Sequence, residues 1–279
     1  MSVFVDIFRA ILGRPKVGPA TPEELARFRE QGYFIRESLF SGAELRRFQD
    51  AVESIHHDMV AAVDDGSAGE IQMVDDKRFQ DISQSNVKWE WQDASRDIRS
   101  MEPFLHLHPD LSGLVDDPRL WRPVQGLIGA ESLSLFTDKL NFKRPGGSPF
   151  PLHQDSPYFA FDCKHVDQLV SMQIYLDDAN RDNGCLWIVP TSHLQGILPG
   201  VQNKGTLDRL YTDMDGLDLP EPVPIEVPAG SIIYFHAHVI HGSKGNRTDA
   251  SRRAMVITYQ PSGHPCWKTG QERPIQMGA

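Results

Sequence analysis

Two helix signals stand near the start of the chain. The segment Thr21–Glu24 combines a capping threonine, a first-turn proline and a glutamate three residues after the cap, which predicts a helix that ends near Gly32. The segment Ser41–Glu44 repeats the signature. The helix that follows it carries apolar residues at helical spacing, so one of its faces should pack on the rest of the fold; these residues are Leu45, Phe48, Val52, Ile55 and Met59.

Strand patterns dominate the second half of the chain. The runs Leu169–Leu176, Ser231–Phe235 and Ala254–Tyr259 are mostly apolar, β-branched or aromatic. Turn residues separate them, among them Asn183-Gly184 and the segment Pro228–Gly230. The sequence therefore predicts several separate strands joined by turns.

Candidate metal ligands fall among these strands. His153, Asp155 and His241 supply two imidazoles and one carboxylate, which can occupy one face of an octahedral metal and leave three positions open. On an extended strand, His153 and Asp155 project to the same side and Gln154 points away. His238 is an alternative distal ligand if a bulge shifts the phase of its strand.

A metal site built from well-separated strands is typical of a double-stranded β-helix. We therefore expect a mainly β fold, with a cupin-like jelly-roll core and N-terminal and flanking α-helices. With 279 residues, of which 40 % are hydrophobic, the chain can bury one substantial core. We interpret 1–279 as a single domain, with a helical N-terminal part at about 1–130 and the jelly-roll core at about 131–262.

Composition excludes several classes of protein. A net charge of -10 argues against nucleic-acid binding, which needs a basic surface. Cys163, Cys185 and Cys266 form no C-x-x-C pair, so neither a zinc ribbon nor a disulfide framework is expected. No apolar run has membrane-spanning length and no signal peptide is evident, which favours the cytoplasm. The oligomeric state stays open, with a monomer favoured.

Over most of its length the chain resembles the phytanoyl-CoA dioxygenase family of Fe(II)/2-oxoglutarate-dependent oxygenases. The segments that carry the resemblance include 23–28, 32–33, 151–155, 158–159, 183–186, 241–243, Asn246 and Arg252. The resemblance implies a jelly roll in which His153, Asp155 and His241 hold Fe(II), with 2-oxoglutarate and O2 as co-substrates. No catalytic residue is expected beyond these metal ligands. Halogenases related to this family have a small residue in place of Asp155, so halogenation is not expected.

The resemblance also assigns the distal carboxylate of 2-oxoglutarate to Arg252. A guanidinium matches a carboxylate with two parallel hydrogen bonds. Arg253 would face the other way on a strand, so only one of the two arginines can enter the cavity. Ser243 could add a hydroxyl hydrogen bond to the same carboxylate.

The iron-proximal carboxylate of 2-oxoglutarate has weaker candidates. The family commonly uses a tryptophan and a lysine there. By position, Gln173 stands for the tryptophan and Lys88 is a loose match for the lysine. Lys139, Asn141 and Lys143 compete with them, although an ordinary solvated or capping set is an equally good interpretation.

The resemblance implies a dioxygenase that hydroxylates a C–H bond of a small or lipid-like molecule and releases succinate and CO2. The alternative is a non-catalytic metal-binding or sensory jelly-roll protein. Fatty acyl thioesters, natural products and other small molecules all remain candidate substrates.

Two further segments have open interpretations. The apolar residues of Met1–Leu12 fall on one helical face, which fits a membrane-surface anchor, a partner helix or, as we expect, a packed helix. Residues 201–224 have little periodicity and are predicted to form a mobile lid, with an ordered packed loop as the alternative.

Overall fold

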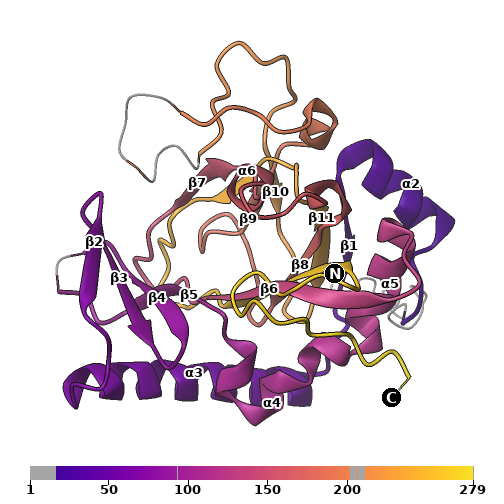
Figure 1. Cartoon of the computed structure of the whole chain (residues 1–279). Coiled ribbons are helices and arrows are strands. Elements are labelled where there is room, and N and C mark those ends of the chain that lie inside the picture. Colours follow the sequence, from indigo (N-terminus) through magenta and orange to yellow (C-terminus); the bar gives the residue numbers. More distant parts are fainter. Residues whose placement is uncertain (1–16, 93, 202–205, 207–210, 279) are drawn as a thin grey trace, which may run out of the picture.

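The structure is a computed structural model that describes residues 17–92, 94–201, 206 and 211–278 (Figure 1). Its helices are α2 (Pro22–Gln31), α3 (Gly42–Asp64), α4 (Pro109–Ser112), α5 (Pro118–Ile128) and α6 (Ser156–Phe159), with 3-10 turns η1 (Leu105–Leu107), η2 (Leu114–Asp116), η3 (Val166–Gln168) and η4 (Ser192–Gln195). Both predicted helix starts are confirmed, because Thr21 and Ser41 each close a capping box at α2 and α3.

The strands of the described residues form two antiparallel sheets that face each other (Figure 1). The larger sheet has the order β1 (Tyr33–Arg36), β11 (Ile232–His236), β8 (Val170–Tyr175), β13 (Ala254–Pro261), β6 (Leu133–Asn141), β5 (Ile98–Glu102), β4 (Ser85–Trp89), β3 (Lys77–Ile82) and β2 (Ile71–Val74). The smaller sheet has the order β10 (Val223–Ile225), β9 (Leu186–Ile188), β12 (His241–Ser243) and β7 (Phe150–His153). This arrangement is the expected jelly-roll architecture with flanking helices.

Strict alternation along the central strands separates the core from the cavity. On β13, Met255, Ile257 and Tyr259 join a core cluster that also contains the apolar face of α3. The intervening Val256 and Thr258 face the space between the sheets, where they line a cavity. Because side chains on a strand alternate between faces, one strand supports both the helical layer and the site. Figure 1 shows α3 running along the outer side of the larger sheet.

The expectation of a helical N-terminal part at 1–130 is wrong in one respect. This part contributes β1 to β5, all of which belong to the larger sheet. β1 pairs with β11, and the β2–β5 meander extends the sheet from β6. These strands are hard to predict from the sequence because they are short and not uniformly buried. β2 is largely exposed and β3 is partly exposed, so neither has a regular alternation of apolar and polar residues.

Two sequence predictions lie wholly or partly outside the described residues. The predicted helix at Met1–Leu12 lies wholly outside them. The predicted lid lies partly outside them, at 202–205 and 207–210. The described part of that lid favours the packed-loop interpretation, because Met214, Leu217 and Leu219 pack against a small buried cluster with Leu152 of β7. In the part of the chain that the structure describes, no helix is both long and apolar enough to cross a membrane.

Candidate metal centre

His153, Asp155 and His241 converge between the two sheets. His153 and His241 are direct cross-strand partners on β7 and β12, with ring centroids 4.4 Å apart. The Oδ1 atom of Asp155 lies 3.7 Å from Nε2 of His153 and 3.9 Å from Nε2 of His241. One ligand atom from each residue falls within 4.8 Å of the others, and no second cluster of this kind occurs among the described residues.

Backbone carbonyls set the orientation of both imidazoles. Nδ1 of His153 lies 2.8 Å from the carbonyl of Pro151, and Nδ1 of His241 lies 3.0 Å from the carbonyl of Val239. A carbonyl only accepts, so each Nδ1 carries the proton and each Nε2 keeps its lone pair for a metal. Burial, and then the neighbouring His241, lower the pKa of His153 to about 3, which keeps its imidazole in the neutral ligand form.

Asp155 reaches the site by a different route from the one expected. The strand ends at His153, and Asp155 has helical backbone angles (φ -74, ψ -32) at the start of α6. Its carbonyl accepts hydrogen bonds from the backbone N–H groups of Tyr158 and Phe159. A proline in the first turn favours this helical start. The prediction of one extended strand through both ligands is therefore wrong, although their side chains meet.

Gln154 points away from the metal position, as predicted, and ties the ligand strand to its surroundings. Its side chain is buried, and Nε2 donates to the carbonyls of His238 (2.6 Å) and Gly196 (2.8 Å). Its Oε1 accepts from the backbone N–H of Leu198, and its own N–H donates to Oγ1 of Thr212. Gln154 thus holds β7 against two neighbouring loops.

His238 takes no part in the cluster. Its Nε2 lies 2.5 Å from Oδ1 of Asp167. Of the two histidines, His241 is the one that lies in the cluster with His153 and Asp155.

A cavity opens onto the three candidate ligands, and Arg252 lies buried in its wall. The guanidinium of Arg252 stands 5.6 Å from the centre of the Tyr175 ring. Its Nε is buried and has no hydrogen-bond partner among the described residues. An unpaired buried donor is costly, so this end of the cavity fits a carboxylate ligand.

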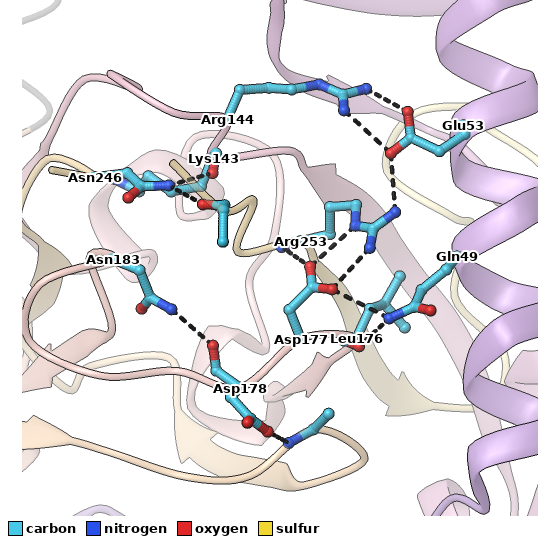
Figure 2. A network of polar contacts seen from close by, with 12 residues as sticks. Gln49, Glu53, Lys143, Arg144, Leu176, Asp177, Asp178, Asn183, Asn246 and Arg253 are labelled. Carbon is cyan, nitrogen blue, oxygen red and sulfur yellow. Dashed lines mark hydrogen bonds and ion pairs between the residues drawn. The ribbon is translucent and has the colours of Figure 1, made fainter. Parts of the chain in front are cut away.

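Arg253 points toward Asp177 and toward Glu53 of α3 (Figure 2). Its guanidinium pairs with Asp177 at 2.7 Å and with Glu53 of α3 at 2.9 Å. The strand register predicted from the sequence therefore agrees with the structure, with Arg252 inside the cavity and Arg253 outside it.

The other predicted co-substrate residues separate into two groups. Ser243 and Gln173 line the cavity. Lys88 also lines it, but its Nζ lies 3.1 Å from Oε1 of Glu102. Of the competing residues, Lys139 and Asn141 also line the cavity.

Lys143 is not part of the cavity wall. It is buried, and its Nζ donates to the carbonyls of Ser148 and Lys244, each at 2.8 Å. It serves to hold the loop before β7.

Some residues of the wall were missed in the sequence. Thr137 and Thr258 line the cavity, and strand alternation from Lys139 and Val256 would have found them. Glu102 and Tyr158 also line it. Nothing in the local pattern around Glu102 marks it, because its partners come from other segments.

Comparisons with known proteins agree with this geometry. A family profile described as phytanoyl-CoA dioxygenase (PhyH) matches residues 28–254. A methylphosphonate hydroxylase of Gimesia maris is 29 % identical over 239 residues, which cover 86 % of this chain and 80 % of that protein. A 2-aminoethylphosphonate dioxygenase of the uncultured bacterium HF130_AEPn_1 is 32 % identical over 160 residues, 57 % of each protein. The crystal structure of SnoK, a non-haem α-ketoglutarate-dependent carbocyclase from nogalamycin biosynthesis, superposes with a TM-score of 0.68 and 20 % identity, covering 95 % of this chain and 100 % of SnoK.

Proposed function

Because the chain belongs to the phytanoyl-CoA dioxygenase (PhyH) family, we propose that it is an Fe(II)- and 2-oxoglutarate-dependent oxygenase that hydroxylates a C–H bond of a small molecule. One observation carries this proposal. Two imidazoles and a carboxylate converge on one point, and the buried Arg252, with an unpaired Nε, lines the same cavity.

The donor set fits Fe(II). His153, Asp155 and His241 would hold one face of the ion and leave the remaining positions to other ligands. When bound, Fe(II) and 2-oxoglutarate would supply the activation of O2, in which 2-oxoglutarate loses CO2 to become succinate, one oxygen atom enters succinate and the other enters the substrate. The protein supplies imidazoles that are oriented by backbone carbonyls.

Arg252 would bind the distal carboxylate of 2-oxoglutarate through its planar guanidinium. Ser243 and Gln173 line the same cavity and could each donate one hydrogen bond to the co-substrate.

Relatives named for phosphonate substrates make small phosphonates the first compounds to test. Fatty acyl thioesters and natural products form the second group. The name of SnoK, a carbocyclase, is a reason to analyse products as well as turnover.

The test measures succinate released from 2-oxoglutarate by the Fe(II)-loaded protein, with and without each compound. Substrate-dependent succinate and a product heavier by one oxygen atom are expected. Asp155→Ala should abolish both. A protein that binds Fe(II) and 2-oxoglutarate but never consumes the co-substrate with any compound would instead be the non-catalytic metal-binding or sensory protein.

A further inference from the structure

The cavity contains a second group of charged residues beside the metal ligands. Lys88 and Lys139 line the wall with Glu102. Lys268 lines a neighbouring cavity and reaches Glu102 from there. The Nζ atoms of Lys88 and Lys268 lie 3.1 and 3.3 Å from Oε1 of Glu102. We call Lys88, Lys139, Lys268 and Glu102 the lysine cluster.

The strand register explains why these side chains meet. Ser100 pairs with Asn141 and Met101 with Leu140 on β5 and β6. The next pair in this register therefore places Glu102 beside Lys139, on the face of the sheet that lines the cavity. Lys88 belongs to β4, whose Asn86 is the partner of Glu102, so Lys88 approaches the carboxylate diagonally.

Aromatic rings help to hold the ammonium groups in place. Nζ of Lys268 lies 4.0 Å from the centre of the Trp267 ring, and Nζ of Lys139 lies 5.2 Å from that of Phe150. Such contacts stabilise a cation without neutralising it. The rings therefore help to fix the positions of these two ammonium groups.

The charges of this cluster do not balance. Three lysines face one carboxylate, an excess of two positive charges (three minus one). Burial on its own raises the pKa of Glu102, but Lys88, Lys139 and Lys268 together lower it to about 2, so it is fully ionised. Burial, followed by the nearby Lys88, lowers the pKa of Lys139 to about 8.

The metal centre and its co-substrate do not need this excess. Under the proposed function, Fe(II) and Arg252 contribute three positive charges, and Asp155 with 2-oxoglutarate contributes three negative ones. Arg252 also stands four residues before Val256, the cross-strand partner of Lys139, which is about 13 Å of extended chain. The lysine cluster thus lies apart from the arginine end of the cavity.

Unused hydrogen-bonding atoms lie on the same strand as Lys139. Oγ1 of Thr137 and Oδ1 of Asn141 are buried without a partner among the described residues, and both residues line the cavity. β6 thus presents Lys139 beside the Thr137 hydroxyl, which can donate a hydrogen bond to an anion, whereas the free oxygen of Asn141 can only accept one. Buried cations and polar atoms without partners are costly unless a ligand completes them.

We propose that Lys88 and Lys139, supported by Lys268 on the far side of Glu102, form a subsite for a doubly negative group of the substrate, of the size and charge of a phosphonate or phosphate. This inference rests on the proposed function, because it completes the substrate side of the same cavity. Since Lys88 and Lys139 share that cavity with the metal ligands, the anionic group lies only a few bonds from the oxidised carbon. A small organic anion meets this condition, whereas the phosphates of an acyl-CoA lie far from its acyl carbon.

The experiment uses the protein loaded with Fe(II) and 2-oxoglutarate without oxygen, and measures binding of methylphosphonate by calorimetry. Methanesulfonate, which has the same shape with a single negative charge, serves as the ligand control. Lys139→Met and Lys268→Met remove one charge each from different segments. Lys164→Met removes the same charge from an exposed residue and serves as the matched control variant.

We expect methylphosphonate to bind more tightly than methanesulfonate, and each of Lys139→Met and Lys268→Met to weaken its binding by about tenfold or more. Lys164→Met should stay within about twofold of the unaltered protein, as exposed charges contribute little. Equal methylphosphonate affinity in all four proteins would place the anion on the metal or elsewhere and overturn the proposal, as would the absence of binding to the unaltered protein. Coenzyme A binding that depends on the same lysines would overturn the small-anion assignment.

The same samples separate this inference from the proposed function. Affinity for 2-oxoglutarate should be unchanged in Lys139→Met and Lys268→Met. If 2-oxoglutarate binds normally while methylphosphonate fails to bind, only the subsite is wrong. If 2-oxoglutarate does not bind to the unaltered Fe(II)-loaded protein, the proposed function itself fails.

Discussion

Arg252 and Arg253 are neighbours in sequence, yet their guanidinium groups lie on opposite sides of the strand that they precede. Arg252 enters the cavity with an unpaired Nε, while Arg253 pairs with Asp177 and Glu53 (Figure 2). Two identical side chains in consecutive positions therefore provide a matched pair of variants, one directed at binding and the other at stability.

Arg252→Ala should weaken the binding of 2-oxoglutarate by on the order of 2 to 4 kcal/mol, or roughly 30- to 700-fold, because charge-assisted hydrogen bonds are lost. Iron affinity should change little. Arg253→Ala should leave 2-oxoglutarate affinity nearly unchanged and lower the melting temperature instead. Titration of 2-oxoglutarate into both Fe(II)-loaded variants is the measurement, and a reversed pattern would show that the assignment of the two arginines is wrong.

Replacement of any metal ligand should remove both iron and turnover. His153→Ala, Asp155→Ala and His241→Ala each leave only two donors, so we expect a large loss of Fe(II) occupancy after gel filtration. His238→Ala is the matched control, because that imidazole pairs with Asp167 and lies outside the cluster. Loss of iron in His238→Ala with retention in His241→Ala would move the distal ligand three residues upstream.

Gln154→Ala should weaken the site without altering a ligand. The change leaves the carbonyls of His238 and Gly196 and the N–H of Leu198 without their present partner. Because unpaired buried groups are expensive, we expect a loss of about 3 kcal/mol in the free energy of unfolding. Chemical denaturation checks this value, and a loss below about 0.5 kcal/mol, typical of surface substitutions, would contradict the anchoring function of this side chain.

Lys143 should make stability depend on pH. Burial, and then the charge of Arg252, lower its pKa from 10.5 to about 6. A neutral amine still has two N–H groups for the carbonyls of Ser148 and Lys244. Between these two pKa values the unfolded chain binds a proton that the folded protein does not, so the Lys143 contribution to stability increases as the pH rises.

Lys143→Met removes this titration and serves as the reference. The melting temperature of the unaltered protein, relative to that of Lys143→Met, should rise from slightly acidic to alkaline pH. A difference that is flat or falls with pH would show that Lys143 keeps its proton in the folded protein.

Sequence patterns predicted the parts of this molecule that depend on local rules. Capping signals placed the starts of α2 and α3, and residue chemistry selected His153, Asp155 and His241. The pattern failed where long-range contacts decide the outcome. The strand leaves its path after His153 because Asp155 starts a helical turn, and Glu102 gains its importance only from lysines on other segments. Neither fact is written in a window of neighbouring residues.

The cross-strand pairing of His153 and His241 also bears on how this site can vary among related proteins. Adjacent positions on a strand point to opposite faces, so a slip of one residue between β7 and β12 would turn one imidazole out of the site. Insertions in the connecting loops leave the pairing untouched. The length of the loops can therefore change among related proteins, whereas the alignment of these two strands cannot. Distant members of the family are better compared by which residues pair across the strands than by the number of residues between their histidines.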